Sequence, residues 1–420
     1  MEKEIPTAAL DINEDELEHL PWDTSARSCY LKSKTSRFMP PMPRSLSFLS
    51  LVLALLYSTP ASASVDRLTA LGGLNRATID DSNSFLFPAT ISEWPRFEVE
   101  LFDEWAGIAF PLSTRHTVGL FFNRRPSDLT EFSNYIRQSG SDLFQSMAPS
   151  PWIDLAYGYV PSKEIAFGAM TSIAYDRSTL GHRAASASNA DLRMGLRFGS
   201  GAGSTVDLGI GLLLHRLQDQ NPTGDQFKHT DGTGLSLDLR YRRSIGRKTL
   251  WLPYIGFKRD AVALAPEQRR QTLFQLGMGL QVKPARGVVL VAAIDTRYQH
   301  NQQSTASQPV SEKRDLLLPA WVLASETQVG STILRLGVRH ESWLSDNEQY
   351  RGTEIVKNSL FETKFTTQIG LGFKFANLAL DGLLERDFLR DGPHFIGGSR
   401  HGGGILSHLS LTYRFATTSE

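Results

Sequence analysis

From about residue 95 to the end of the chain, apolar and polar residues alternate in segments of about 7 to 15 residues. Successive side chains of a β-strand point to opposite faces, so this period predicts strands with one apolar and one polar face. The clearest segment is 361–373, where Phe361 and Phe365 share one face while Glu362 and Lys364 share the other. The pattern therefore predicts an all-β chain.

We predict sixteen strands, and fourteen as the alternative count, because the first two strands are short. Pro253 and Pro319 fall inside two of them. Proline has no N–H to donate to a strand ladder, so each position predicts either a bulge or a misplaced strand. The predicted strands are 95–102, 105–111, 115–123, 151–160, 163–175, 189–199, 204–216, 234–244, 249–258, 271–283, 287–299, 314–325, 329–341, 360–373, 376–387 and 403–415.

After the second strand, the connections between strands alternate between short and long. This rhythm is typical of outer-membrane barrels, which have short periplasmic turns and long external loops. With an even strand number, it places both ends of the barrel in the periplasm. We therefore expect a transmembrane antiparallel up-and-down β-barrel over residues 95–415. The long connections are 124–150, 176–188, 217–233, 259–270, 300–313, 342–359 and 388–402.

The two faces of the predicted strands have different surroundings. In lipid every backbone N–H and C=O must be paired within the protein, so the strands must close into a barrel with the apolar face outward. A soluble barrel would reverse the faces, but sixteen strands would enclose a lumen too wide for side chains to fill. The mixed charges of the polar face indicate either a weakly selective channel or internal ion pairs that brace the wall. The expected pore-lining residues are Arg193, Arg197, Asp207, Asp238, Arg240, Arg242, Arg297, Arg335, Arg339, Glu362, Lys364, Asp381, Glu385 and Arg414.

Composition narrows the function classes. The chain has 44 Lys+Arg and 44 Asp+Glu, so it lacks the basic excess typical of nucleic-acid binding, and we expect no nucleic-acid partner. A mean hydropathy of −0.22 is too low for a helical membrane protein but suits a barrel, in which every second residue faces lipid. The single cysteine, Cys29, precedes the predicted cleavage site described below.

No metal, cofactor or nucleophile motif occurs in the chain, so we expect no cofactor, no metal site and no enzymatic activity. His340 and Ser342 lie near a predicted outer strand end and leave a lipid hydrolase as one alternative. Such an enzyme would also need a third residue to orient the histidine.

Residues 39–64 have the layout of a secretory signal peptide. Arg44 provides a positive region, 46–57 is a largely apolar run, and 61–63 is a small-residue cleavage motif. The apolar run is too short to span a bilayer as a helix, which needs about 20 residues. We interpret residues 1–38 as an upstream extension or a mis-assigned start. The signal predicts export to the periplasm and insertion into the bacterial outer membrane.

The last predicted strand ends in alternating apolar residues and an aromatic, over 409–415. This ending resembles the C-terminal assembly signal of bacterial outer-membrane proteins, although a tail at 416–420 follows the aromatic. The resemblance implies that the outer-membrane assembly machinery recognises the chain, with outer-membrane lipids as its surroundings.

Residues 65–94 precede the first strand and form a predicted periplasmic or lumenal plug. Glycines on the lumenal face, such as Gly211 and Gly279, suggest either room for this segment inside the barrel or sharp local curvature. The segment contains Arg-Ala-x-x-Asp-Asp followed by Pro-Ala-x-Ile, which resembles the N-terminal region of the long-chain fatty-acid outer-membrane transporter family. That resemblance implies a hatch inside a fourteen-stranded barrel that takes up hydrophobic compounds. The plug candidates are Arg76, Asp80, Asp81 and Pro88.

These observations favour a porin-like channel or passive diffusion transporter for small solutes, with hydrophobic compounds among the candidates. The alternatives are a structural or interaction barrel without transport, and an outer-membrane lipid hydrolase. The sequence does not identify the solute.

Overall fold

The computed structural model describes residues 65–102, 104–138, 142–180, 183–200, 203–220, 226–228, 232–264, 267–305, 308–351, 354–384 and 406–415. The predicted signal peptide, the upstream extension, Glu385 and the C-terminal tail lie outside these residues. Among the residues described, no helix is both long and apolar enough to cross a membrane.

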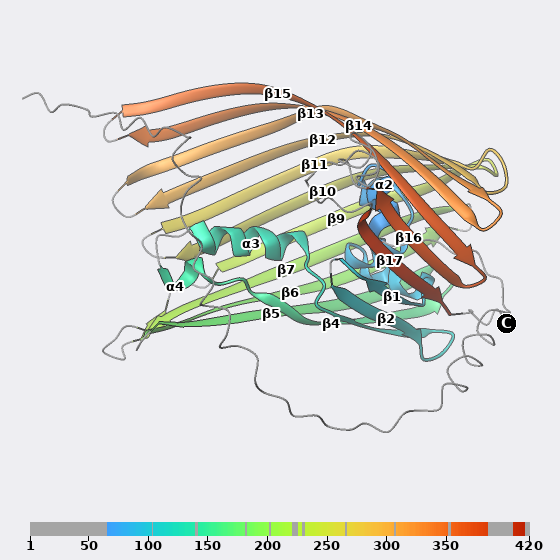
Figure 1. Cartoon of the computed structure of the whole chain (residues 1–420), viewed down its shortest axis with the longest axis horizontal. Helices are drawn as coiled ribbons and strands as arrows, with labels where there is room; N and C mark the ends of the chain where they lie inside the picture. The colour runs from blue at the N-terminus through green and yellow to red at the C-terminus, as the bar shows by residue number, and fades with distance from the viewer. Residues whose placement is uncertain are drawn as a thin grey trace, which may run out of the picture. The chain divides into compact units, whose positions relative to one another are not determined.

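The described strands form one antiparallel sheet that closes on itself (Figure 1). Each strand pairs with its sequence neighbours, except that the short β8 pairs only with β7, and β7 continues to β9. The ring closes where β17 pairs with β1 over five residue pairs. Leaving β8 aside, sixteen strands make up the barrel, which confirms the predicted fold and the higher strand count.

The strands of the first half are β1 (Arg96–Glu100), β2 (Trp105–Pro111), β3 (His116–Phe122), β4 (Ser150–Ser162), β5 (Ile165–Leu180), β6 (Arg183–Ser200), β7 (Ser204–Gln220), β8 (Gln226–Lys228) and β9 (Gly232–Ile245). Those of the second half are β10 (Thr249–Leu264), β11 (Glu267–Val282), β12 (Val288–Thr305), β13 (Gln308–Val329), β14 (Thr332–Arg351), β15 (Glu354–Phe375), β16 (Leu378–Leu384) and β17 (Leu406–Arg414).

The apolar face points outward and the polar face inward, as the alternation predicted. On β7, Ile210 and Leu212 are 44% and 42% exposed, whereas Asp207 between the same neighbouring strands is fully buried. On β6, Met194 is 71% exposed. So large an exposed apolar surface would be unfavourable in water, and a bilayer provides the matching solvent. The outer surface is therefore that of a membrane-spanning barrel.

Several strands extend further than predicted at the end away from the short turns. The predicted long loops 176–188, 259–270, 300–313 and 342–359 are wrong in extent, because most of their residues continue the strands. Beyond the apolar band the outward residues become charged, as in the outward Lys357–Glu348 pair. Backbone pairing does not require an apolar face, so these strands continue where the hydrophobic signal ends.

The two prolines have different consequences for the wall. At Pro319 the β13–β14 register shifts between Leu318 and Trp321, which confirms the predicted bulge. Pro253 keeps its place opposite Met278 in β11, and only its pairing with β9 is interrupted. Both strands are therefore correctly placed.

The height of the wall is uneven. β13 and β15 have 22 residues each, whereas β1 has 5 and β2 and β3 have 7. A strand needs about 9 to 11 residues to cross the apolar core of a bilayer. The sector from β1 to β3, which we call the low wall, therefore spans only part of that core. Leu101 and Phe102, at the end of the β1–β2 hairpin, are each 55% exposed.

Two segments outside the strands lie within the barrel. The first, the lumenal segment (residues 65–94), comprises the α-helix α2 (Val65–Ala70) and three short 3-10 helices, η4 (Asn75–Ala77), η5 (Asp81–Phe85) and η6 (Pro88–Glu93). The second, the α3–α4 insert, follows β3 and comprises α3 (Ser127–Gln138) and α4 (Asp142–Gln145). In Figure 1 the lumenal segment lies near the short turns, and the insert lies toward the far ends of the long strands.

Candidate functional site: the occupied lumen

The lumenal segment packs against the inner face of the wall at positions without a side chain. At Gly168 and Gly195, a Cβ atom would collide with the backbone of Pro88 and Ala89. Equivalent collisions would occur at Gly209, Gly279 and Gly337, against Leu86, Ala77 and Ala70. These glycines therefore let the backbone of the segment approach the strands directly.

Arg67 ties the start of the lumenal segment to the wall. Its guanidinium donates to Asp80 within the segment at 2.5 Å and to Glu326 of β13 at 2.6 Å. Glu326 also accepts from Arg335 of β14 at 2.7 Å, and Arg335 in turn reaches Asp381 of β16 at 2.5 Å. The chain of ion pairs thus links the segment to three strands.

A second network holds the middle of the segment. Asp207 of β7 accepts from Arg197 at 2.8 Å and from Arg240 at 2.9 Å, and it also pairs with Arg242. Arg240 donates in addition to the Thr78 carbonyl at 2.9 Å, and it is completely buried. A buried guanidinium with five donors needs such a set of acceptors, and the segment supplies part of it.

Two further attachments lie at η4 and at the end of η6. Arg76 donates to Asp238 of β9 at 2.7 Å and to Gln275 of β11 at 2.8 Å. Glu93 pairs with Arg197 and, at 3.3 Å, with Arg242. Charged contacts with the wall thus occur along the whole length of the segment.

Asp81 lies where the first and last strands of the barrel meet. Arg96 of β1 approaches its carboxylate to 3.9 Å and Arg414 of β17 to 3.5 Å. Burial and the neighbouring Asp80 carboxylate raise the pKa of Asp81 well above its ordinary value. Together with Arg76, Asp80 and Pro88, it belongs to the plug candidates that the sequence singled out, and all four lie inside the barrel.

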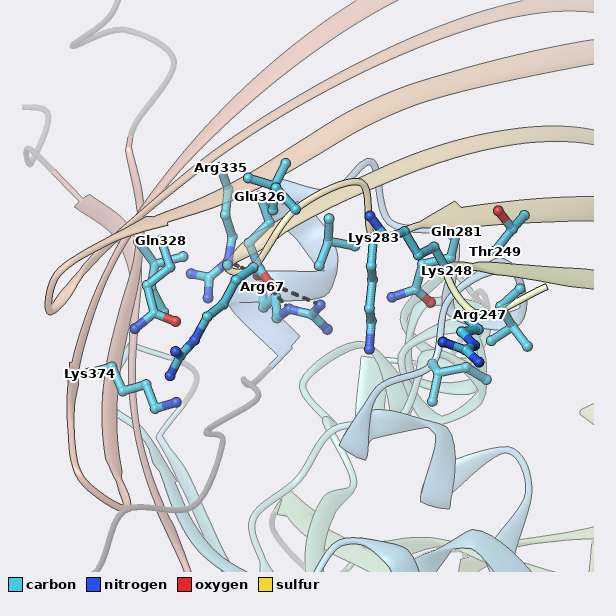
Figure 2. A pocket seen from close by; sticks show the side chains of 18 of the residues that line it. Arg67, Arg247, Lys248, Thr249, Gln281, Lys283, Glu326, Gln328, Arg335 and Lys374 are labelled. Carbon is cyan, nitrogen blue, oxygen red and sulfur yellow. Dashed lines mark hydrogen bonds and ion pairs between the residues drawn. The ribbon is translucent and has the colours of Figure 1, made fainter. Parts of the chain in front are cut away.

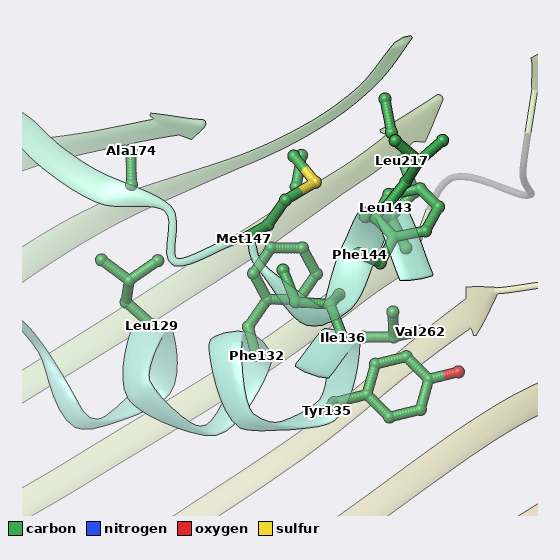
Figure 3. Packing of buried hydrophobic residues seen from close by; sticks show 12 residues of the cluster. Leu129, Phe132, Tyr135, Ile136, Leu143, Phe144, Met147, Ala174, Leu217 and Val262 are labelled. Atoms are coloured by element: carbon green, nitrogen blue, oxygen red, sulfur yellow. The ribbon is translucent and has the colours of Figure 1, made fainter. Parts of the chain in front are cut away.

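The α3–α4 insert is held mainly by apolar packing (Figure 3). Phe132 and Ile136 of α3, and Phe144 of α4, are almost completely buried. They belong to a cluster of twelve buried hydrophobic residues that includes Leu217 of β7 and Val262 of β10 from the wall. This cluster is the largest apolar core described within the barrel.

A smaller polar contact set fixes the same insert. Asp128 pairs with Lys258 of β10 at 2.5 Å and with Arg193 of β6 at 3.8 Å. Burial would raise the pKa of Asp128, but these two cations outweigh it and hold the pKa below its ordinary value. The His215 ring stacks on Phe132 with centroids 4.5 Å apart.

The remaining predicted pore-lining residues do not join these networks equally. Arg339 pairs with Glu341 and donates to the Gly72 carbonyl at 3.1 Å. Among the described residues, the one carboxylate that pairs with Arg297 is that of Asp295, at 3.9 Å. Glu362 and Lys364 are exposed on β15, beyond the lumenal segment. The predicted residues therefore divide between those that contact the lumen contents and those on the free wall.

His340 and Ser342 lie on the outward side of β14. The His340 ring stacks on the Trp321 ring, with centroids 5.6 Å apart. Glu341, which lies between His340 and Ser342 in the sequence, pairs with Arg339 in the lumen. Glu341 is therefore engaged elsewhere and does not orient His340 as a catalytic dyad would require.

The sequence reasoning missed several residues of the site. Arg67 and Glu93 lie in the predicted plug but were not among its candidates, and Glu326 falls just after the predicted end of a strand. Glu326 faces the lumen because the bulge at Pro319 changes which residues of β13 point inward. The sequence does carry a signal for these residues. Each charged residue of the segment needs a partner, and the inward face of the strands offers charges of both signs.

No protein-family model matches the chain, and no curated protein sequence matches it. The chain is similar to the solved structure of the alcaligin outer-membrane receptor FauA from Bordetella pertussis, with 8% identity, a TM-score of 0.38, and coverage of 76% of this chain and 75% of that one. It is also similar to the toluene transporter TodX from Pseudomonas putida, with 9% identity, a TM-score of 0.34, and coverage of 86% and 99%.

These similarities carry no argument about the solute, and the resemblance of the lumenal segment to the fatty-acid transporter family stays a prediction. The structure itself gives the class of protein. A closed antiparallel wall, an apolar exterior and a charged, filled interior belong together in one setting, since only closed barrels satisfy all strand backbones in lipid. The protein is therefore a membrane-spanning antiparallel β-barrel.

Proposed function

We propose that the protein is an outer-membrane diffusion transporter for small solutes, and that the lumenal segment is its plug. The observation that carries the proposal is the polar attachment of this segment, through Arg67–Glu326, Arg76–Asp238 and Glu93–Arg197. A filler with a purely structural role would be fixed best by apolar packing. Buried ion pairs contribute little net stability compared with apolar side chains, because desolvation offsets their attraction. When such a segment moves away from the wall, water and dissolved ions can replace the wall charges with which its side chains pair. Its release is therefore less costly than the release of an apolar segment.

A reversible tether tests whether the segment must move. A Cβ atom at position 279 would lie 2.9 Å from that of Ala77 and closer still to the Ala77 carbonyl oxygen, so the pair Ala77→Cys and Gly279→Cys forms a disulfide once the segment backbone moves slightly away from the wall. This displacement is common to the oxidised and the reduced protein, so their comparison reports the tether alone. A matched control joins two wall strands, through Thr179→Cys and Ala184→Cys, which face each other on β5 and β6. Cys29→Ser is included in both variants to remove the native thiol.

The measurement is single-channel current in planar bilayers. We expect openings to disappear when the 77–279 pair is oxidised and to return on reduction, while the wall–wall pair leaves them unchanged. Equal currents from oxidised and reduced protein, with the disulfide verified by mass, would overturn the plug. An intact heat-modifiable barrel without any current in untethered protein would favour a structural or interaction barrel instead.

One observation favours hydrophobic compounds as a solute class. The inner face of the low wall carries an aromatic group. Phe121 of β3 packs against Trp105 of β2 and against Phe85 of the lumenal segment, with ring centroids 6.4 and 5.1 Å apart. Small apolar compounds could exchange between this inner surface and the bilayer over the exposed end of the β1–β2 hairpin. A water-filled route would have no use for apolar residues at that edge.

Uptake of a labelled aromatic hydrocarbon by cells tests this second candidate. Leu101→Lys places a charge at the hairpin end and should slow uptake severalfold. Leu112→Lys, at an exposed short turn, is the matched control and should have no effect. Equal uptake by the two variants would exclude the low wall as a route.

A further inference from the structure

A cavity of about 1410 Å³ lies at the short-turn end of the barrel, beside the start of the lumenal segment (Figure 2). Residues of four turns line it, within 244–249, 283–288, 328–330 and 374–376. In Figure 2 the side chains of Lys283 and Lys374 extend from the turns toward this space. We call this cavity the vestibule.

The vestibule has a strong excess of positive charge. Among the described residues that line it, eight are basic and one, Glu326, is acidic. Three of the basic residues, Arg67, Arg335 and Arg414, are paired with carboxylates of the lumen, so the excess comes from the other five. Glu326 already accepts from Arg67 and Arg335, so its charge is neutralised by the two cations nearest to it. The basic residues are Arg67, Arg247, Lys248, Lys283, Arg286, Arg335, Lys374 and Arg414.

The basic residues contributed by the turns have no acidic partner within the described residues. Lys248 donates to the Pro284 carbonyl at 2.8 Å, and no ion pair involves Arg247, Lys283, Arg286 or Lys374 among the residues that the structure describes. Like charges on low-dielectric walls reinforce one another, so the vestibule concentrates anions.

A buried amide also lines the vestibule. Gln281 of β11 is 93% buried, and its side-chain oxygen has no hydrogen-bond partner among the described residues. This oxygen accepts hydrogen bonds, so it can bind a donor group of a ligand, such as the hydroxyl of a protonated phosphate, while the positive charge of the site comes from the turns.

The positive charge is a local property of one side of the barrel end. A second cavity of about 710 Å³, also bordered by short turns, is lined by Lys163, Arg197 and a single acid, Glu93. There the charges nearly balance. The chain as a whole has equal numbers of basic and acidic residues, so the vestibule is not the result of an overall basic composition.

We infer that the vestibule is a binding site for small oxyanions, meaning solutes that carry phosphate or carboxylate groups. Arg247, Lys283, Arg286 and Lys374 supply the charge, and Gln281 supplies a buried acceptor for a ligand hydroxyl. For transport through the lumen, as distinct from the route over the low wall, the site also defines a solute class, and this part rests on the proposed function. A mouth lined by one sign of charge makes an open channel selective for the opposite sign.

Binding of inorganic pyrophosphate to the full chain in detergent, measured by equilibrium dialysis at low salt, tests the site directly. Arg247→Glu with Lys283→Glu should weaken binding at least tenfold. The matched control reverses two charges at short turns outside the vestibule, Arg115→Glu with Lys163→Glu, and should bind as the unmodified protein does. Heat-modifiable migration checks that every barrel is folded.

Reversal potentials in a KCl gradient test the second part. The unmodified channel should prefer chloride, and the Arg247→Glu and Lys283→Glu variant should lose or reverse that preference. Absence of pyrophosphate binding to the folded protein, or equal binding by the two double variants, would overturn the site. Specific binding without any channel current would keep the oxyanion site and refute the transport function, so the two failures are distinguishable.

Discussion

The lumenal segment and the α3–α4 insert both occupy the barrel, but they are held by different interactions. The segment meets the wall through ion pairs such as Arg67–Glu326 and Arg76–Asp238. Its apolar residues, including the fully buried Ile91, are divided among three smaller clusters. The insert shares one cluster of twelve hydrophobic residues with the wall. Apolar burial is lost in full when a segment moves into water, whereas ion pairs are partly replaced by hydration. The difference marks the lumenal segment as the part better suited to move.

The largest expected effect is on the insert. Phe132→Ala removes a buried ring from the centre of its cluster and should destabilise the docked insert by about 4 kcal/mol. Hydrogen exchange of residues 127–147 should accelerate accordingly, while that of residues 65–94 should not change. Faster exchange in both regions would show that the two segments are held as one unit.

A somewhat smaller effect is expected for the lumenal segment. Arg67→Met keeps the bulk of the side chain but leaves Asp80 and Glu326 without this partner, which should destabilise the segment by about 3 kcal/mol. Arg67→Lys keeps the charge without the two-pronged geometry and should lose less. The measurement is hydrogen exchange at residues 65–94. Equal exchange in the Arg67→Met and Arg67→Lys variants would contradict the view that ion pairs hold the lumenal segment.

The glycine contacts offer a purely steric test. Gly195→Val places side-chain atoms where the backbone of Ala89 lies and should cost about 2 kcal/mol through overpacking. We expect more frequent channel openings without loss of the folded barrel. Gly199→Val on the same strand is the control, because a Cβ atom there would meet its nearest neighbour at 3.4 Å. Indistinguishable channel records from the two variants would argue against close packing of the segment.

The smallest effect concerns pH. Because the pKa of Asp128 is lower in the folded protein, its contribution is complete above its unfolded value, about 3.9, and is lost as the pH falls further. Asp128→Asn should therefore weaken the docked insert by about 1 kcal/mol at neutral pH. The difference between the two proteins in exchange at residues 127–147 should shrink as the pH falls below the unfolded pKa and through the lower folded pKa of Asp128. A difference that persists there would assign the effect to packing.

Asp81 should respond in the opposite direction. Its raised pKa means that the folded protein holds the proton of Asp81 more tightly than the unfolded chain does. Ionisation of Asp81 therefore destabilises the folded protein, and this effect grows as the pH rises above the ordinary pKa of an aspartate. Asp81→Asn should therefore not loosen the lumenal segment at neutral pH. Accelerated exchange at residues 65–94 in this variant would show that the Arg96 and Arg414 contacts dominate.

The strand pattern could be predicted because lipid and lumen impose opposite polarities on alternate residues. Leu208 and Asp207 illustrate this, and they face outward and inward as predicted. The prediction failed beyond the apolar band, where outward residues such as Arg314 and Lys357 are charged and the alternation no longer marks a strand. Periodicity reports the solvent on each face, and it does not report the hydrogen bonds that define the strand.

The site could be predicted only as a set of inward charges. That Arg240 faces the lumen follows from its parity, but its bond to the Thr78 carbonyl depends on the path of the lumenal segment. Glu326 could not be placed, because its inward direction depends on the bulge at Pro319. The sequence predicts a long connection over 124–150, where the structure has the two helices of the α3–α4 insert. Contacts with distant strands fix the position of these helices, and the local sequence pattern does not contain that information.

The closure between β1 and β17 has a consequence for the time course of assembly. A finished ring has no edge through which the lumenal segment could pass sideways, so seating it before closure avoids threading it through the mouth. Asp81 is approached by Arg96 from the first strand and by Arg414 from the last. The lumenal segment thus gives both ends of the wall a common partner. We expect it to serve during assembly as the template around which the wall is joined.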